Sequence, residues 1–109
     1  MEITFIKFAR QQGLKYVTDQ ERGYTRRKAG KGFVYLDDRK KRVQNKKVID
    51  RIQSLVIPPA WQEVWICPHP NGHLQVTGRD ARRRKQYKYH PEWSQSRNET
   101  KFEKMLLFG

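Results

Sequence analysis

The stretch "VWICPHPNGHLQVTGRDARRRKQYKYH", residues 64–90, decides the fold. Residues 64–67 and 73–80 are strand-like, and the turn-forming residues of "PHPNG" separate them, so together they predict a β-hairpin. "QYKYH", residues 86–90, predicts a further strand after a basic turn. Three consecutive antiparallel strands are therefore expected in this part of the chain.

The second of these strands shows the alternation that is typical of a sheet with one buried face. Successive side chains of a strand point to opposite faces. We therefore expect Leu74 and Val76 to point inward, and Gln75 and Thr77 to point outward.

Residues before this stretch add strands and a helix. "GYTRRKAGKGFVYLDDRKKRV", residues 23–43, predicts short strands with turns at its glycines and at its paired aspartates. "NKKVIDRIQSLVIPPAW", residues 45–61, predicts a helix that Asn45 caps and that Pro58 and Pro59 end. Its apolar stripe at helical period consists of Val48, Ile49, Ile52, Leu55 and Val56.

The two ends of the chain complete the predicted architecture. Pro91 is suited to a first helical position, and Asn98 could cap a separate second helix after it. Residues 1–13 show neither helical caps nor alternation, so we expect a loosely ordered arm before a domain over residues 14–109. Strands, helix, strands and helix in this order predict an α+β fold, with a small antiparallel sheet of about five short strands and two or three short helices.

Positive charge dominates the composition. The 109 residues include 24 Lys and Arg against 11 Asp and Glu, and the net charge is +13. Such an excess favours a polyanionic partner, nucleic acid first and an acidic membrane surface second. The single cysteine excludes an internal disulfide, and no apolar run suits a secretory signal or a membrane span. We expect a cytoplasmic, nucleoid-associated protein.

The cationic side chains gather beside predicted turns, from which they can reach phosphates without reading the base sequence. The alternative is that they form a merely solvated surface. The groups are Arg22, Arg26, Arg27, Lys28 and Lys31; Arg39 to Arg42 with Lys46 and Lys47; and Arg79 to Lys88.

Two tyrosines follow the last cationic group. In a strand, Tyr87 and Tyr89 share one face, and Gln86 lies on the other. The phenols could stack and bond phosphate oxygens while Gln86 pairs with adenine in the major groove. The tyrosines could equally be half-buried residues that cover the core. Trp61 and Trp65 are expected to be core anchors.

The sequence lacks the motifs of common metal sites and phosphate-binding loops. Cys67, His69, His73 and His90 supply zinc-type ligands, but their spacing matches no common structural site. The carboxylates are scattered, which disfavours two-metal cleavage, and "AGKGF" lacks the spacing of a phosphate-binding loop. We therefore predict no metal and no cofactor. Metal-free cleavage of a phosphodiester by a tyrosine nucleophile remains an alternative, because the residue types that it needs are present.

Three stretches carry a family resemblance: "RRKAGKGFVYLD", "RIQSLVIPPAWQEVWICPHPNGHLQVTGRDARRRKQYKYHPEW" and "KFEKMLLFG". From about Leu14 to Gly109 the chain resembles the N-terminal domain of bacterial, poxvirus-like type IB DNA topoisomerases. The resemblance implies an enzyme that nicks one strand through a 3′-phosphotyrosine, without ATP or metal, in a separate C-terminal catalytic domain. It also implies that the N-terminal domain closes over the duplex from the major-groove side.

The resemblance further implies which residues bind. The partners would be double-stranded DNA and the catalytic domain of the same parent chain, and this monomeric domain alone would have no catalytic residues. Arg83 stands where the family commonly has glycine, so we expect a reshaped basic turn if that glycine needs a positive φ. The implied DNA-binding residues are Arg84, Lys85, Gln86, Tyr87, Tyr89 and Arg97.

Two alternatives from other classes remain. One is a stand-alone nucleic-acid-binding module, for RNA among other targets, which would favour unpaired bases because aromatic platforms stack on them. The other is an autonomous nicking enzyme that uses Tyr87 or Tyr89, and it would relax a supercoiled plasmid.

Overall fold

The computed structural model describes residues 2–96, which form five strands and three helices. Arg97 and Asn98, for which a DNA contact and a helix cap are predicted, lie outside these residues. No helix among the described residues is long and apolar enough to cross a membrane. The elements are α1 (Glu2–Gln11), β1 (Tyr24–Ala29), β2 (Gly32–Leu36), α2 (Lys46–Ser54), β3 (Gln62–Ile66), β4 (Leu74–Arg79), β5 (Lys85–Tyr89) and α3 (Pro91–Ser96).

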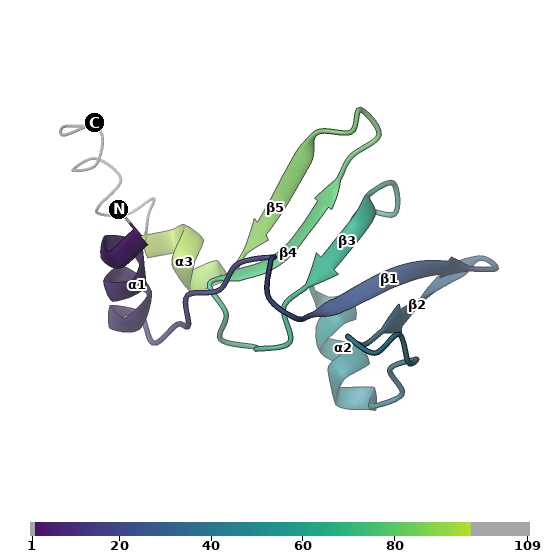
Figure 1. Cartoon of the computed structure of the whole chain (residues 1–109), viewed down its shortest axis with the longest axis horizontal. Coiled ribbons are helices and arrows are strands. Elements are labelled where there is room, and N and C mark those ends of the chain that lie inside the picture. Colours follow the sequence, from purple (N-terminus) through teal and green to yellow (C-terminus); the bar gives the residue numbers. More distant parts are fainter. Residues whose placement is uncertain (1, 97–109) are drawn as a thin grey trace.

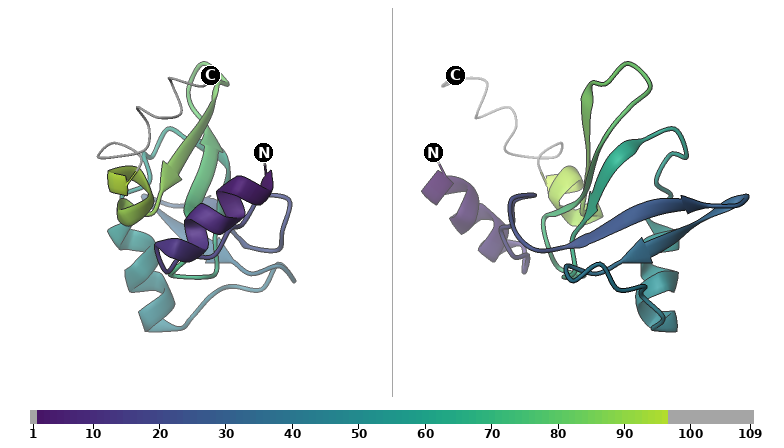
Figure 2. Two further views of the ribbon diagram at one scale, coloured as in Figure 1. Left: turned by 90° about the vertical axis from the view of Figure 1, so that its left-hand side faces the viewer. Right: turned by 45° about the vertical axis from the view of Figure 1, so that its right-hand side comes forward.

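All five strands belong to one antiparallel sheet in the order β2-β1-β3-β4-β5, which confirms the predicted α+β class. Strands β2 and β5 are therefore its two edges. The β4–β5 connection points away from α2, and α1 and α3 lie together at one end of the molecule, opposite the β1–β2 hairpin (Figures 1 and 2).

Helix α2 covers one face of the sheet. Asn45 caps it as predicted, since its side-chain oxygen accepts a hydrogen bond from the backbone N–H of Val48 at 3.2 Å. Ile52 is buried against Ile66 and Val76 of the central strands. Burying one such aliphatic side chain stabilises the fold by about 1.5–3 kcal/mol, so this contact fixes the position of α2.

The predicted helical stripe is too long at its C-terminal end. The helix stops at Ser54, and Val56 has a φ of 51° with 73% of its surface exposed. Ile57 precedes a proline and cannot continue the helix, so the chain turns before the expected last apolar position. Periodicity alone therefore misplaced Val56 in the core.

The segment between α1 and β1 covers the opposite face. Val17 packs with Cys67 and Leu74, and the Thr77 hydroxyl donates to an Asp19 carboxylate oxygen at 3.1 Å. The expectation that Gln75 and Thr77 point outward to solvent is wrong, because they are 3% and 2% exposed. Strand β4 is an inner strand that is covered on both faces, so its polar side chains have hydrogen-bond partners inside the fold.

The expectation that the first residues have no regular structure is also wrong. Helix α1 ends in a glycine cap: Gly13 has a φ of 74°, and the backbone N–H of Leu14 bonds the Ala9 carbonyl at 2.8 Å. The Phe8 ring then packs edge-on against Trp93 of α3, with centroids 5.2 Å apart. Gly13 was the one feature of the sequence that could have predicted the C-terminal end of a helix here. The domain boundary at residue 14 stays a prediction.

Candidate nucleic-acid interface

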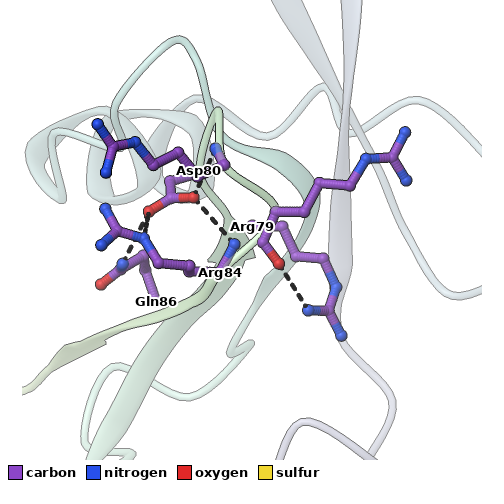
Figure 3. A network of polar contacts seen from close by, with 6 residues as sticks. Arg79, Asp80, Arg84 and Gln86 are labelled. Atoms are coloured by element: carbon purple, nitrogen blue, oxygen red, sulfur yellow. Dashed lines mark hydrogen bonds and ion pairs between the residues drawn. The ribbon is translucent and has the colours of Figure 1, made fainter.

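Asp80 builds the turn between β4 and β5. One carboxylate oxygen accepts hydrogen bonds from the backbone N–H groups of Arg82 and Arg84, each at 2.9 Å (Figure 3). The Asp80 backbone N–H in turn donates to the Arg84 carbonyl at 3.0 Å. Hydrogen bonds from backbone N–H groups, that of Arg84 first, lower the pKa of Asp80 to about 2. The turn is thus closed around an ionised carboxylate.

The second oxygen of this carboxylate engages two predicted DNA-binding residues. It lies 3.0 Å from Arg84 Nε and accepts a hydrogen bond from Gln86 Nε2, also at 3.0 Å (Figure 3). The Arg84 side chain nevertheless stays 65% exposed. Asp80 therefore orients both side chains, a role that the sequence reasoning did not assign to it.

Arg83 keeps the turn in a left-handed conformation. Its φ is 63°, in the region that glycine adopts without steric cost, so Arg83 takes up the conformation that a glycine at this position would favour. Arg79 NH1 donates to the Arg83 carbonyl at 3.2 Å, which helps to hold the peptide (Figure 3). An L-residue in this region costs about 1–2 kcal/mol, which the surrounding hydrogen bonds offset.

The two tyrosines lie on one exposed face of β5, as the strand period predicts. Their rings are stacked with centroids 6.1 Å apart and planes 12° from parallel. Tyr87 is 48% exposed and Tyr89 is 37% exposed. Tyr87 lies directly opposite Thr77 of β4, which places both rings on the face covered by the residue 14–23 segment. Of the two open interpretations, this geometry favours rings that face solvent.

Lys85 is held by a residue far away in the sequence. Its Nζ forms an ion pair with Asp19 Oδ2 and lies 5.7 Å from the Tyr87 ring centroid. Partial burial would raise the pKa of Asp19, but hydrogen bonds from Lys85 and Thr77 lower it overall. No sequence pattern pointed to Asp19, because it lies in an irregular segment.

One of the predicted phosphate-binding cations points inward instead. Arg26 NH2 donates to the carbonyls of Pro58 and Trp61, each at 2.9 Å, and its guanidinium lies 4.0 Å from the Phe33 ring centroid. Burial lowers the pKa of Arg26. Arg26 therefore holds the β1–β3 end of the sheet together, and the prediction that it faces a ligand is wrong.

No metal site is evident among residues 2–96. Three or more His, Cys, Asp or Glu side chains do not come together there in an arrangement that could hold a metal ion. His73 instead accepts a hydrogen bond from the Val17 backbone at 3.1 Å and stacks on Tyr16 at 4.5 Å. Cys67 is buried against Val17 and Leu74.

Turn and strand together form what we name the β4–β5 surface: Arg82, Arg83, Arg84, Lys85, Gln86, Tyr87 and Tyr89. All except Gln86 are exposed in the folded domain. The sequence prediction placed Arg84, Lys85, Gln86, Tyr87 and Tyr89 together, and the structure adds Asp80 and Asp19 as the carboxylates that position them.

The fold and this surface define a small, strongly basic α+β domain with a cationic hairpin at one edge of its sheet. Residues 32–80 match the family of the bacterial DNA topoisomerase IB N-terminal domain. The chain is also 37% identical over 86 residues to DNA topoisomerase 1B of Acanthamoeba polyphaga mimivirus, a match that covers 79% of this chain. The chain belongs to the N-terminal domains of DNA topoisomerases IB. It spans 26% of the length of that viral relative.

Proposed function

We propose that this domain binds double-stranded DNA through the β4–β5 surface, as the clamp of a type IB topoisomerase. The observation that carries the proposal is the position of the stacked pair Tyr87 and Tyr89 next to the cationic turn, on a strand at the edge of the sheet. A two-stranded β-ribbon fits the major groove of B-DNA. An edge strand brings both of its faces to the walls of that groove, so Gln86 and the tyrosines can contact the same duplex.

The roles of the individual side chains follow from their surroundings. Arg84 contacts phosphates while its backbone stays fixed by Asp80. Lys85 reaches phosphates after it leaves Asp19, and the tyrosine hydroxyls approach base edges or the adjacent backbone. Arg97, outside the described residues, is proposed as a further phosphate contact. Tight binding then requires low salt, because phosphate contacts of this kind weaken as counterions are added.

In this proposal, DNA relaxation is carried out by a longer type IB topoisomerase of which this domain is one part. The viral relative is named DNA topoisomerase 1B, and this chain spans 26% of it. We propose that a separate C-terminal catalytic domain forms the 3′-phosphotyrosine and relaxes supercoils without metal or ATP. The domain itself is a monomer that lacks catalytic residues, and it resides with chromosomal DNA in the cytoplasm. Supercoiled plasmid incubated with it alone stays supercoiled.

The test is a titration of a labelled duplex and of its separate strand with wild-type protein and variants. Wild-type protein is expected to bind the duplex more tightly than the single strand. Tyr89→Ala removes a whole ring and Tyr87→Phe removes one hydroxyl, and both should weaken duplex binding.

Tyr24→Phe is the matched control, because Tyr24 is partly buried against the core and loses the same hydroxyl group. It should leave duplex affinity unchanged. A preference for the single strand would favour the stand-alone, base-stacking module. Equal affinity of wild-type protein, Tyr87→Phe and Tyr89→Ala for the duplex would contradict the proposal.

A further inference from the structure

A second turn repeats the architecture of the turn at Asp80. One Asp37 oxygen accepts hydrogen bonds from the backbone N–H groups of Arg39 and Lys41, each at 2.9 Å. The Asp37 backbone N–H donates to the Lys41 carbonyl at 2.8 Å, and Lys40 has a φ of 65°. Asp80 makes the same bonds with Arg82 and Arg84, at the same spacing.

The two turns differ in whether their cationic side chains form ion pairs. The second Asp80 oxygen pairs with Arg84, whereas Arg39, Lys40 and Lys41 form no ion pair among the described residues. Hydrogen bonds from backbone N–H groups, that of Lys41 first, lower the pKa of Asp37 and keep it ionised as the centre of the turn. Arg39, Lys40 and Lys41 are therefore exposed to solvent, and their charge is only partly balanced by Asp37.

Helix α2 carries two lysines at its N-terminus, where positive charge is unfavourable because of the helix dipole. Lys46 and Lys47 form its first turn, which contains no acidic residue. The N-terminus of a helix carries about half a positive charge, so lysines there are electrostatically unfavourable. Both side chains are exposed and have no ion pair in the described part of the chain. Such a cost is offset if an anion binds beside them.

The Asp37 turn and the N-terminus of α2 lie close to each other. Both are distant from the β4–β5 surface. Leu36, at the end of β2, forms a bridge with Arg42, so the Asp37 turn folds back toward the start of α2. The end of β2 pairs with the beginning of β1, which pairs with the end of β3 at Ile66. Residues 80–84 follow Arg79, which pairs with the start of β3. The two turns thus occupy opposite ends and opposite edges of the sheet, and Figure 1 shows the β4–β5 connection far from α2.

We propose that this second cationic surface binds a second stretch of DNA backbone phosphates. It consists of Arg39, Lys40, Lys41, Arg42, Lys46 and Lys47, all of which are exposed. The inference rests on the proposed DNA binding and extends it to an independent surface. Asn45 already caps the backbone N–H of Val48, so α2 contributes the positive end of its dipole beside the two lysines.

DNA phosphates fit this surface better than a membrane or an acidic protein face does. Peripheral membrane binding by a basic helix also needs apolar side chains that insert. The large apolar side chains that are exposed in the described residues are Val56, Tyr87 and Tyr89, and none of them belongs to this surface. Contacts with an acidic protein are typically enriched in aromatic residues, and none of the residues of this surface is aromatic.

The test uses the double variant Lys46→Ala/Lys47→Ala in a duplex titration over a range of salt concentrations. Loss of two phosphate contacts should reduce the slope of log affinity against log salt by about 1.8, and duplex affinity should fall severalfold at low salt. Alanine suits helical positions, and the removal of like charge from the N-terminus of α2 should raise the Tm by about 2–4 °C. A weaker but more stable protein is a combination that misfolding cannot produce.

The control variant is Lys7→Ala/Arg10→Ala, which removes the same charge from exposed positions of α1. It should leave the salt slope nearly unchanged. An equal loss of slope in both double variants would show that net charge alone matters, and this would overturn the second surface. Unchanged duplex binding with weaker binding to phosphatidylserine vesicles would overturn it in favour of a membrane. If Tyr89→Ala has no effect and Lys46→Ala/Lys47→Ala weakens binding, the proposed β4–β5 site fails and the second surface stands.

Discussion

Lys85 Nζ is ion-paired with Asp19 Oδ2, which ties the edge strand β5 to the segment between α1 and β1. The lysine side chain is 35% exposed and the aspartate side chain 18% exposed, so the pair lies at the rim of the sheet. Asp19 also accepts a hydrogen bond from the buried Thr77. A lysine proposed to contact phosphate is thus already neutralised inside the free domain, and DNA must compete with Asp19 for it.

Replacement of Asp19 by asparagine should therefore strengthen duplex binding. Freed Lys85 gains one phosphate contact, and the slope of log affinity against log salt should become steeper by about 0.9. Unfolding in urea should show a loss of stability of about 1 kcal/mol or less, because the pair is partly solvated. Glu92→Gln, at an exposed position of α3 away from both proposed DNA-binding surfaces, makes the same change in net charge. If both variants bind equally well, the ion pair has no influence on DNA binding.

Arg83 occupies a left-handed position that glycine adopts without steric cost. Arg83→Gly should raise the free energy of unfolding by about 0.5–1 kcal/mol, because relief of the left-handed strain exceeds the added chain entropy. Chemical denaturation measures this directly. Arg82→Gly is the matched control: Arg82 has no positive φ, so the same change there should destabilise the protein. A destabilised Arg83→Gly protein would contradict the assigned strain.

Acid should weaken the turn that Asp80 organises. The pKa of Asp80 is about 2 in the fold, against about 3.9 for an unperturbed aspartate. Folding therefore favours the ionised carboxylate, and its contribution to stability is complete above about pH 5 and is lost as the pH falls toward 2. Unfolding curves of wild-type protein and Asp80→Asn should differ at neutral pH and converge in acid. A gap that stays constant down to pH 2 would mean that the charge of Asp80 does not matter.

Patterns that act over a few residues predicted most of the fold. The hairpin strands, the cap at Asn45 and the shared face of Tyr87 and Tyr89 each follow from a local period or a local hydrogen bond. The sequence also placed Trp61 and Trp65 against the core, where the structure confirms them as partly buried.

Features that depend on distant segments could not be predicted in the same way. Gln75 and Thr77 look like solvent-facing residues of a half-buried strand, and only the full sheet order shows that β4 is an inner strand. Arg26 looks like its exposed cationic neighbours, yet the carbonyls before β3 capture it. Asp19 acquires its role through contacts across 58 residues with Thr77, which no local pattern encodes.

The most direct test of the central claim follows the backbone amides of labelled protein during titration with a short DNA duplex at low salt. The largest changes are expected over residues 82–89, with a second, separate set over residues 37–47. Changes confined to α1 and the segment that follows it, with residues 82–89 unmoved, would contradict the assignment of the β4–β5 surface as the DNA-binding element.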